Sequence, residues 1–239
     1  MLSKSQIKLI TSLKQKKYRL QHELFVVEGV KTIKELLQSN LVLHKLYTTE
    51  TFNIDAKDEI LISEADLKRI SFLKSPNKAL AVFKIPEVKQ IDKSKLIVAL
   101  DDVRDPGNLG TIIRLCDWFG IRDLICSKET VDCFNPKVIQ ATMGSITRVN
   151  ISYIDLASFL KDNQTTNYGA FMDGKNVYQT NLLEKGVLVM GNEANGISQE
   201  IESVINERVS IPRFGNIRAT ESLNVATATA VLLSEFKRR

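Results

Sequence analysis

The chain has 239 residues, 44% of them hydrophobic and 26% charged, with a formal net charge of +5 at pH 7. This length suits one large or two ordinary globular domains, and no apolar run approaches the roughly 20 residues of a membrane span. The basic N-terminus lacks an apolar segment followed by a cleavage site, so we expect no signal peptide. Three cysteines without CxxC spacing, and two histidines distant from them, predict free thiols in a reducing cytoplasm and no metal site.

The positive charge is concentrated in the first part of the chain. Residues 1–90 hold 16 Lys and Arg against 10 Asp and Glu, whereas residues 91–239 hold 17 against 18. Such asymmetry favours a polyanionic partner, nucleic acid in particular. The alternative is an ordinary solvated face of a surface helix.

The first 85 residues predict a small α/β domain. We expect a basic amphipathic helix over 3–19, a helix over 30–39 and another from Ser63 to Phe72. Strands are expected at 25–29, 42–48, 59–62 and 79–85. The polar residues 86–95 then form a linker.

After the linker, strands and helices alternate. Residues 96–100 form a continuous apolar run, as expected for a strand buried on both faces of a parallel sheet. Further strands are predicted at 123–126, 148–154, 168–172, 187–190 and 208–211, and helices at 111–119, 136–143, 155–161 and 198–204. This alternation predicts an open α/β sheet, which binds ligands at the carboxyl ends of its strands.

The first segment that could carry chemistry runs from Asp101 to Arg114, after the strand at 96–100. Pro106-Gly107 predicts a turn, and an ordinary βα loop would explain most of the segment. With the helix placed at 111–119, Arg114 faces the positive end of the helix dipole, which costs about 0.3–1 kcal/mol. An arginine there indicates function. The segment matches neither GxGxxG nor the P-loop pattern.

The second segment, Gly191 to Ser198, is a glycine-bounded polar loop after an apolar strand. Its glycines allow unusual backbone conformations or close approach by a ligand. Glu193 lies just past the end of the strand, where a site is expected, although a solvated glutamate in a surface loop would look the same.

The third segment joins Ile211-Pro212 to Ser222-Leu223-Asn224. Ser222 suits the N-cap of the following helix, which leaves Asn224 unexplained. The helix to residue 236 is apolar on more than one stripe, so we expect it to be buried nearly all round. In all three segments, no Ser-His-Asp set, Cys-His pair or adjacent carboxylates support hydrolytic or glycosidic chemistry.

Together the three segments resemble the three motifs of the SpoU/TrmH family of RNA 2′-O-ribose methyltransferases, within the SPOUT class. Asn108-x-Gly110-x-x-x-Arg114 matches the first motif and Gly191-x-Glu193-x-x-Gly196 the second. Ile211-Pro212 with Ser222-Leu223-Asn224-Val225-Ala226 matches the third. The match covers residues 95–239. Through Phe25-Val26-Val27-Glu28-Gly29-Val30-Lys31 and Ala79-Leu80-Ala81-Val82, residues 1–88 resemble the family's RNA-binding domain, which is similar to ribosomal protein L30e.

The resemblance implies a fold and a cofactor. Residues 95–239 would form a SPOUT α/β domain with a deep trefoil knot, an exception to the usual absence of knots. S-adenosyl-L-methionine would be the methyl donor, with its adenosine part held by backbone at Gly191, Ile211 and Leu223. The family works as a homodimer with its sites at the interface, which fits an apolar helix over 222–236.

The resemblance also implies roles for individual residues. Arg114 would orient the RNA and stabilise alkoxide charge, with a phosphate oxygen or Arg114 itself left open as the proton acceptor. Asn108 would fix its loop and contact the RNA or Arg114, Glu193 would hold Arg114 or a loop amide, and Ser222 and Asn224 would complete the pocket. The candidates for phosphate contacts are Lys14, Lys16, Lys17 and Arg19.

Other functions remain open at this point. Ribosomal RNA is the expected substrate, with transfer RNA or a non-catalytic RNA-binding or ribosome-assembly protein as alternatives; the missing Gly-rich fingerprint counts against a nucleotide-dependent oxidoreductase. The sequence names neither the RNA nor the modified nucleotide. One departure from the family is the longer link Arg213–Glu221, in which Arg213 replaces a frequent Met.

Overall fold

A computed structural model describes residues 2–215 and 222–238. The chain divides into two compact units, and the first is discontinuous: it consists of residues 1–87 and 132–147, and the second of residues 88–131 and 148–239. Within the described residues, no helix has both the length and the apolar character needed to cross a membrane. The three cysteines are buried and none of them is in a disulfide.

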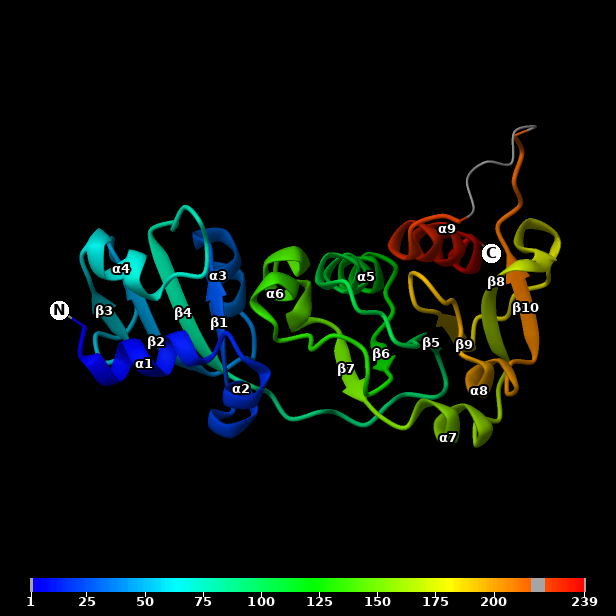
Figure 1. The fold of residues 1–239 in the computed structure, drawn as a ribbon, viewed down its shortest axis with the longest axis horizontal. Helices are drawn as coiled ribbons and strands as arrows, with labels where there is room; N and C mark the ends of the chain where they lie inside the picture. The colour runs from blue at the N-terminus through cyan, green and yellow to red at the C-terminus, as the bar shows by residue number, and fades with distance from the viewer. Residues whose placement is uncertain (1, 216–221, 239) are drawn as a thin grey trace. The chain divides into compact units, whose positions relative to one another are not determined.

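The first unit is built on a four-stranded sheet in the order β1-β4-β2-β3 (Figure 1). Strand β4 runs antiparallel to β1 and β2, whereas β2 and β3 are parallel. Ile10, Leu13, Val26, Ile70 and Leu80 belong to its buried core. The strands are β1 (Leu24–Glu28), β2 (Leu43–Thr48), β3 (Glu59–Leu61) and β4 (Ala79–Lys84); the helices are α1 (Lys4–Ser12), α2 (Lys16–His22), α3 (Val30–Leu37) and α4 (Glu64–Ile70).

The single helix expected over 3–19 is in fact two helices, because the chain breaks between α1 and α2. The buried guanidinium of Arg19 stabilises the break: its Nη1 donates to the carbonyls of Leu13 (2.8 Å) and Lys14 (2.9 Å). These carbonyls lie past the end of α1, where a helix leaves acceptors unsatisfied.

Residues 132–147 complete the first unit, although they lie between two strands of the second. They contain α6 (Pro136–Thr142) and a 3-10 turn η1 (Ser145–Thr147), and α6 contacts β1. The Phe134 ring packs 4.8 Å from that of Phe25. Arg19 also donates to the carboxylate of Asp132, from Nε at 2.9 Å and Nη2 at 2.5 Å.

The second unit is an α/β layer structure with a six-stranded parallel sheet in the order β10-β8-β9-β5-β6-β7. Helices α5 and α9 lie on one face of this sheet and α7 and α8 on the other (Figure 1). The strands are β5 (Leu96–Leu100), β6 (Asp123–Cys126), β7 (Asn150–Tyr153), β8 (Asn167–Asn176), β9 (Gly186–Met190) and β10 (Glu207–Ser210); the helices are α5 (Pro106–Trp118), α7 (Leu156–Lys161), a 3-10 turn η2 (Val177–Gln179), α8 (Gln199–Glu202) and α9 (Val225–Lys237).

Helix α5 begins five residues earlier than expected. Asp105 is its N-cap and accepts a hydrogen bond from the Asn108 amide at 2.8 Å, and Pro106 occupies the first helical position, where its fixed φ is suited to a helix. Arg114 therefore lies in the third turn. Its expected position in the first turn, opposing the helix dipole, is wrong.

Helix α9 also differs from expectation. Its N-cap is Asn224 rather than Ser222: Asn224 Oδ1 accepts from the amides of Ala226 (2.9 Å) and Thr227 (3.3 Å). The expected burial nearly all round is wrong within one chain, because Leu233 is buried whereas Thr227 is exposed. The face of α9 with the small residues Thr227, Ala228 and Ala230 is only partly covered by the rest of the chain.

Candidate active site

Two loops of the site are brought together by neighbouring parallel strands. Strands β5 and β9 pair in register from Leu96 with Gly186 to Leu100 with Met190, so both carboxyl ends lie at one edge of the sheet. The loop from Asp101 to Asp105 leaves β5 there, and the loop from Gly191 to Ser198 leaves β9. The pairing continues one step further, with the Asp101 amide donating to the Met190 carbonyl at 2.9 Å.

Glu193 connects these loops through three hydrogen bonds. Its Oε1 accepts from Asn108 Nδ2 at 3.0 Å and from the Asp105 amide at 3.2 Å, and its Oε2 accepts from the Arg104 amide at 3.3 Å. Burial pushes the pKa of Glu193 upward, but these hydrogen bonds outweigh burial and the pKa lies below its ordinary value. The Glu193 carboxylate bonds to two loop amides and to the Asn108 side chain, and not to Arg114. Its role in the reaction stays a prediction.

Asn108 links this pair to the third segment. Its Oδ1 accepts from Asn224 Nδ2 at 2.8 Å while its Nδ2 donates to Glu193. One chain of side-chain hydrogen bonds thus joins Asn224, Asn108 and Glu193, although Asn108 is separated from each of the others by more than 80 residues in sequence. Each of the three motifs contributes one member.

Two further polar residues lock the loops, and neither was singled out from the sequence. Asn192 Nδ2 donates to the Asp102 carbonyl at 2.7 Å, while its Oδ1 accepts from the amides of Ala194 and Asn195. Asp101, which is 6% exposed, accepts from the Ser198 amide at 2.7 Å. The signal for Asn192 was available, because an asparagine in a glycine-bounded loop commonly bonds backbone groups two residues on.

Glycine is required at position 191 by a close backbone approach. Asn192 and Gly196 form an isolated antiparallel bridge, with two backbone hydrogen bonds of 2.9 Å. A Cβ atom built on Gly191 would lie 2.2 Å from the Gly196 carbonyl carbon. Gly196 itself has φ +71°, a region that side-chain-bearing residues rarely adopt.

Arg114 and Ser222 are not in this chain of hydrogen bonds. Arg114 is exposed on α5, six residues beyond Asn108, and within the described ranges its guanidinium has no hydrogen bond or ion pair. Ser222 is exposed just before Asn224. Both side chains are accessible to a bound molecule, and their catalytic roles stay predictions.

The residues expected to bind the cofactor offer backbone groups. Ile211 is half-buried after β10 and Leu223 is 49% exposed, and neither donates or accepts a backbone hydrogen bond with another described residue. Amides and carbonyls that are available next to apolar side chains suit the adenine ring of a nucleoside. Residues 213–215 of the longer link are described, and residues 216–221 lie outside the described residues.

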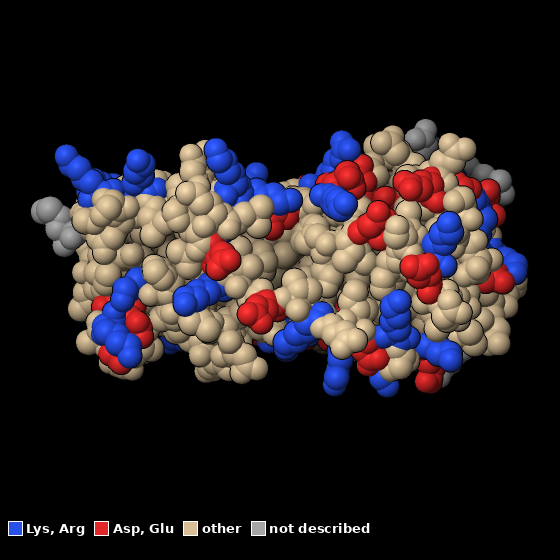
Figure 2. Space-filling view, turned by 90° about the horizontal axis from the view of Figure 1, so that it is seen from below, with Lys and Arg blue, Asp and Glu red and all other residues tan. Residues whose placement is uncertain are grey.

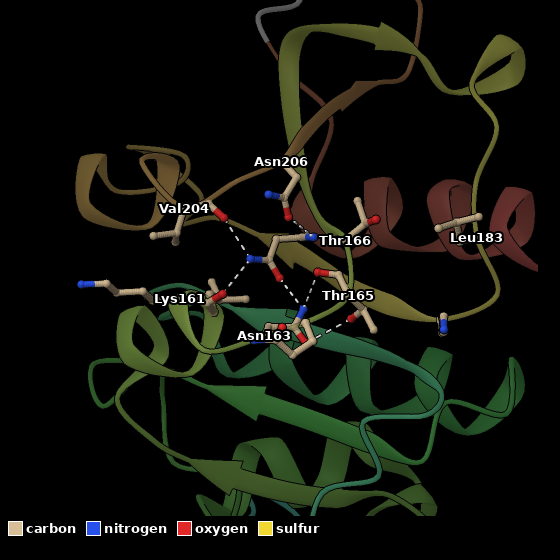
Figure 3. A pocket seen from close by; sticks show the side chains of 11 residues that line it. Lys161, Asn163, Thr165, Thr166, Leu183, Val204 and Asn206 are labelled. Carbon is tan, nitrogen blue, oxygen red and sulfur yellow. Dashed lines mark hydrogen bonds between the residues drawn. The ribbon is translucent and has the colours of Figure 1, made fainter.

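A hollow of about 570 Å³ in the second unit lies elsewhere, at the amino ends of β8, β9 and β10. Figure 3 shows Asn163, Thr165 and Asn206 around it. Its amides are bonded within the protein: Asn163 Nδ2 donates to Asn167 Oδ1 at 2.7 Å, and the Asn167 amide donates to Asn206 Oδ1 at 2.8 Å. This network ties loops together at the edge opposite the motif residues, so we do not assign the active site to it.

The basic residues singled out from the sequence fall into two groups. Lys14, Lys16 and Lys17 are exposed. Arg19 is 2% exposed and bonded to Asp132 and two carbonyls. Its expected role as a phosphate contact does not fit this burial. Among the described residues, no group of three or more His, Cys, Asp or Glu side chains could hold a metal ion.

The surface charge of the second unit is mixed. On the face that Figure 2 shows, basic and acidic side chains lie interspersed over this unit. The nearly balanced composition of residues 91–239 agrees with that distribution. A polyanion that reaches this face of the second unit would meet carboxylates as well as cations.

Known proteins that are similar to this chain in sequence and structure are named as RNA methyltransferases. RlmP of Bacillus subtilis, a 23S rRNA (guanosine(2553)-2′-O)-methyltransferase, is 28% identical over 234 residues, or 94% of this chain and 93% of its own. A Porphyromonas gingivalis structure assigned to the TrmH family of RNA methyltransferases is 38% identical, with a TM-score of 0.91 over 100% of this chain and 99% of its own. The AdoMet-bound rRNA methyltransferase of Sinorhizobium meliloti is 29% identical, with a TM-score of 0.87 over 100% and 97%.

Fold and site together define an enzyme of the RNA methyltransferase class. The sequence model of the SpoU rRNA methylase family matches residues 95–234, and that of the MRM3-like substrate-binding domain matches residues 4–81. The chain belongs to the SpoU rRNA methylase family.

Proposed function

We propose that this chain transfers the methyl group of S-adenosyl-L-methionine to a ribose 2′-hydroxyl of ribosomal RNA. The observation that carries the proposal is the Asn224–Asn108–Glu193 chain of hydrogen bonds, which assembles three distant motifs at the ligand-binding edge of a parallel sheet. Its family relatives and AdoMet-bound neighbour support the same chemistry.

The cofactor would be held by backbone at Gly191, Ile211 and Leu223. When bound, it supplies a methyl group that its sulfonium centre already activates. The amides and carbonyls of Ile211 and Leu223 bond to no other described backbone group, so they are available to the adenosine part. The protein then has to position the hydroxyl and manage its proton.

Arg114 is the residue we propose to act on the ribose. A guanidinium keeps its proton in proteins, which favours electrostatic stabilisation of the developing alkoxide over proton abstraction. The hydroxyl proton would pass to a phosphate oxygen of the RNA, because a protonated guanidinium has no site that can accept it. The hydrogen bond between Asn224 and Asn108 holds the first turn of α5, the helix that presents Arg114. Ser222 would close the pocket beside them.

Recognition would be divided between two domains, residues 1–88 for RNA binding and residues 95–239 for transfer. The first unit has the exposed lysines Lys14, Lys16 and Lys17, and its family match is to a substrate-binding domain. Phosphate contacts of this kind are independent of sequence, so the choice of nucleotide must come from other contacts. Ribosomal RNA is favoured over transfer RNA because RlmP methylates 23S rRNA.

We further propose a cytoplasmic homodimer whose chains are knotted in the second unit. The buried cysteines, none of them in a disulfide, suit a reducing compartment. The outer face of α9 carries half-buried Ala228, Ala230 and Val231, and the C-terminal residue of the neighbouring helix α5, Trp118, is 84% exposed. An exposed tryptophan beside an apolar helix face suits a subunit interface, where aromatic residues are enriched.

The first test is incubation with radiolabelled S-adenosyl-L-methionine and unmodified ribosomal or transfer RNA, with Arg114→Ala in parallel. We expect wild type to yield a 2′-O-methylated nucleotide in ribosomal RNA. Arg114→Ala should fold and bind cofactor, yet lose nearly all transfer. Wild-type turnover in that variant would refute the role of Arg114. RNA binding by wild type without cofactor binding or transfer would instead establish a non-catalytic RNA-binding protein.

A further inference from the structure

One exposed cation at the carboxyl edge of the second unit has no part in the function proposed so far. Arg104 lies in the β5–α5 loop, and its side chain is 70% exposed. Its backbone amide donates to Glu193 Oε2, so it directly adjoins the cluster of Glu193, Asn108 and Asn224. Its place next to the site and its exposure together make it accessible to the same substrate.

Asp102 fixes the orientation of this guanidinium. Arg104 Nε donates to Asp102 Oδ1 at 2.7 Å, while the two terminal nitrogens make no hydrogen bond to another described residue. A guanidinium bonded to protein through Nε presents its outer edge to solvent as a two-pronged donor, the geometry that matches a phosphate.

The backbone of Asp102 is held by two hydrogen bonds in addition to its ion pair with Arg104. Its φ is +57°, a left-handed conformation that is uncommon outside glycine. Its amide donates to Ser127 Oγ at 3.0 Å, and its carbonyl accepts from Asn192 Nδ2 at 2.7 Å. These two hydrogen bonds hold the Asp102 backbone, and with it the carboxylate that orients Arg104.

The charges around the site create a need for such a cation. Asp102, Asp105 and Glu193 bring carboxylates to the edge where RNA must approach. An unneutralised phosphate would be repelled there, and Arg114 is the cation assigned to the ribose itself. We infer that Arg104, oriented by Asp102, binds an RNA phosphate flanking the methylated ribose.

The inference rests on the proposed function, because it assumes that RNA enters this edge. The test measures filter binding of unmodified 23S rRNA, made by transcription, at several salt concentrations, together with cofactor affinity by calorimetry. Variants are Arg104→Ala, Arg104→Lys and Asp102→Asn. The matched control is Arg148→Ala, which removes an arginine from another surface pair, with Asp117 at 2.8 Å, before β7.

We expect Arg104→Ala to weaken RNA binding about tenfold, as for removal of a charge-assisted bond, and to lower the salt slope by about 0.7–0.9. Arg104→Lys should restore the slope but not the affinity, and Asp102→Asn should keep the slope and lose part of the affinity. Cofactor affinity should not change. Arg148→Ala should stay within about twofold of wild type, as for a surface pair away from the site.

Equal behaviour of Arg104→Ala and Arg148→Ala would overturn the inference, and so would a selective loss of cofactor affinity, which would place Arg104 on the cofactor's carboxylate. If Asp102→Asn does not fold, the RNA affinities and salt slopes of Arg104→Ala and Arg104→Lys still test the inference. Failure of the proposed function is distinguishable: wild type would then bind RNA without labelling it, while the comparison of binding constants remains valid.

Discussion

At the scale of single residues, one amide group performs two tasks. Asn224 caps α9 with its oxygen and donates to Asn108 with its nitrogen. Either task alone would be met by other residue types, since Ser, Thr or Asp also cap helices. Only a side chain with an amide group at this distance from the backbone supplies both. The N-cap was predicted at Ser222 because serine is a common cap, whereas the cap is Asn224.

Replacing Asn224 with Asp separates the two tasks. The carboxylate should still accept from the amides of Ala226 and Thr227 and suits the positive end of α9, so thermal unfolding should change little. It cannot donate to Asn108 Oδ1, and two acceptors would face each other. We expect methyl transfer to fall at least tenfold, while Asn224→Ala should also lose about 1 kcal/mol of stability. Full activity of Asn224→Asp would contradict the bridging role.

Glu193 gives the site a defined response to pH. Its pKa is lowered in the folded protein, so its stabilising contribution is fully present above the ordinary glutamate pKa and disappears as the pH falls through the folded value. The difference in free energy of unfolding between wild type and Glu193→Gln should therefore be constant at neutral pH and shrink only in acid. Denaturant titrations across the pH range measure this difference in free energy. A difference that grows on acidification would contradict the prediction, because it would mean that folding raises the pKa of Glu193.

At the scale of elements, the β9–α8 loop offers two glycines with different constraints. Gly191→Ala places a methyl group against backbone, which must move, and this should displace Glu193 from its donors. Gly196→Ala meets no atom within 4 Å, so only its positive φ is unfavourable, by about 1–2 kcal/mol. We expect the first variant to lose cofactor binding and transfer, and the second to keep both with a lowered melting temperature. If Gly196→Ala instead lost cofactor binding and Gly191→Ala kept it, the backbone conformation at Gly196 would matter more than the space beside Gly191.

The elements also show what could be predicted from sequence. The strand at 96–100 was predicted with its correct bounds, because a continuous apolar run between polar residues has few other interpretations. The start of α5 was missed because Pro106-Gly107-Asn108 is typical of a turn, while a proline in the first helical turn also fits a helix start. The break after α1 depends on Arg19, whose partner Asp132 is 113 residues away. No local pattern contains such an interaction.

At the scale of the whole molecule, the basic residues of the first unit divide into surface and interior. Replacing Lys14, Lys16 and Lys17 with Ala should weaken RNA binding and reduce its salt slope by about 0.7–0.9 for each phosphate that is no longer neutralised. It should have little effect on stability. Arg19→Ala leaves Asp132 without its partner in a half-buried setting and should cost about 3 kcal/mol or more of unfolding free energy. Salt titrations and denaturant melts measure both; an unchanged slope in the triple variant would remove the lysines from the RNA interface.

The three motifs were identified from sequence, but how they meet could not be. Spacing along the chain places Asn108, Glu193 and Asn224 near strand or helix ends, and nothing in it indicates that two asparagines and a glutamate share hydrogen bonds. The linker at 86–95 marked one chain boundary between the units. The excursion of residues 132–147 into the first unit has no compositional signal, since its apolar residues look like any other buried helix.

That excursion has a consequence for synthesis. Domains usually fold as units while the chain emerges, the N-terminal one first. Here the first unit lacks Asp132, Phe134 and α6 until residue 147 has left the ribosome, by which time β5, α5 and β6 of the second unit have also emerged. Until then Arg19 lacks its partner Asp132, and the first unit cannot complete its fold. We therefore expect the two units to fold together rather than one after the other.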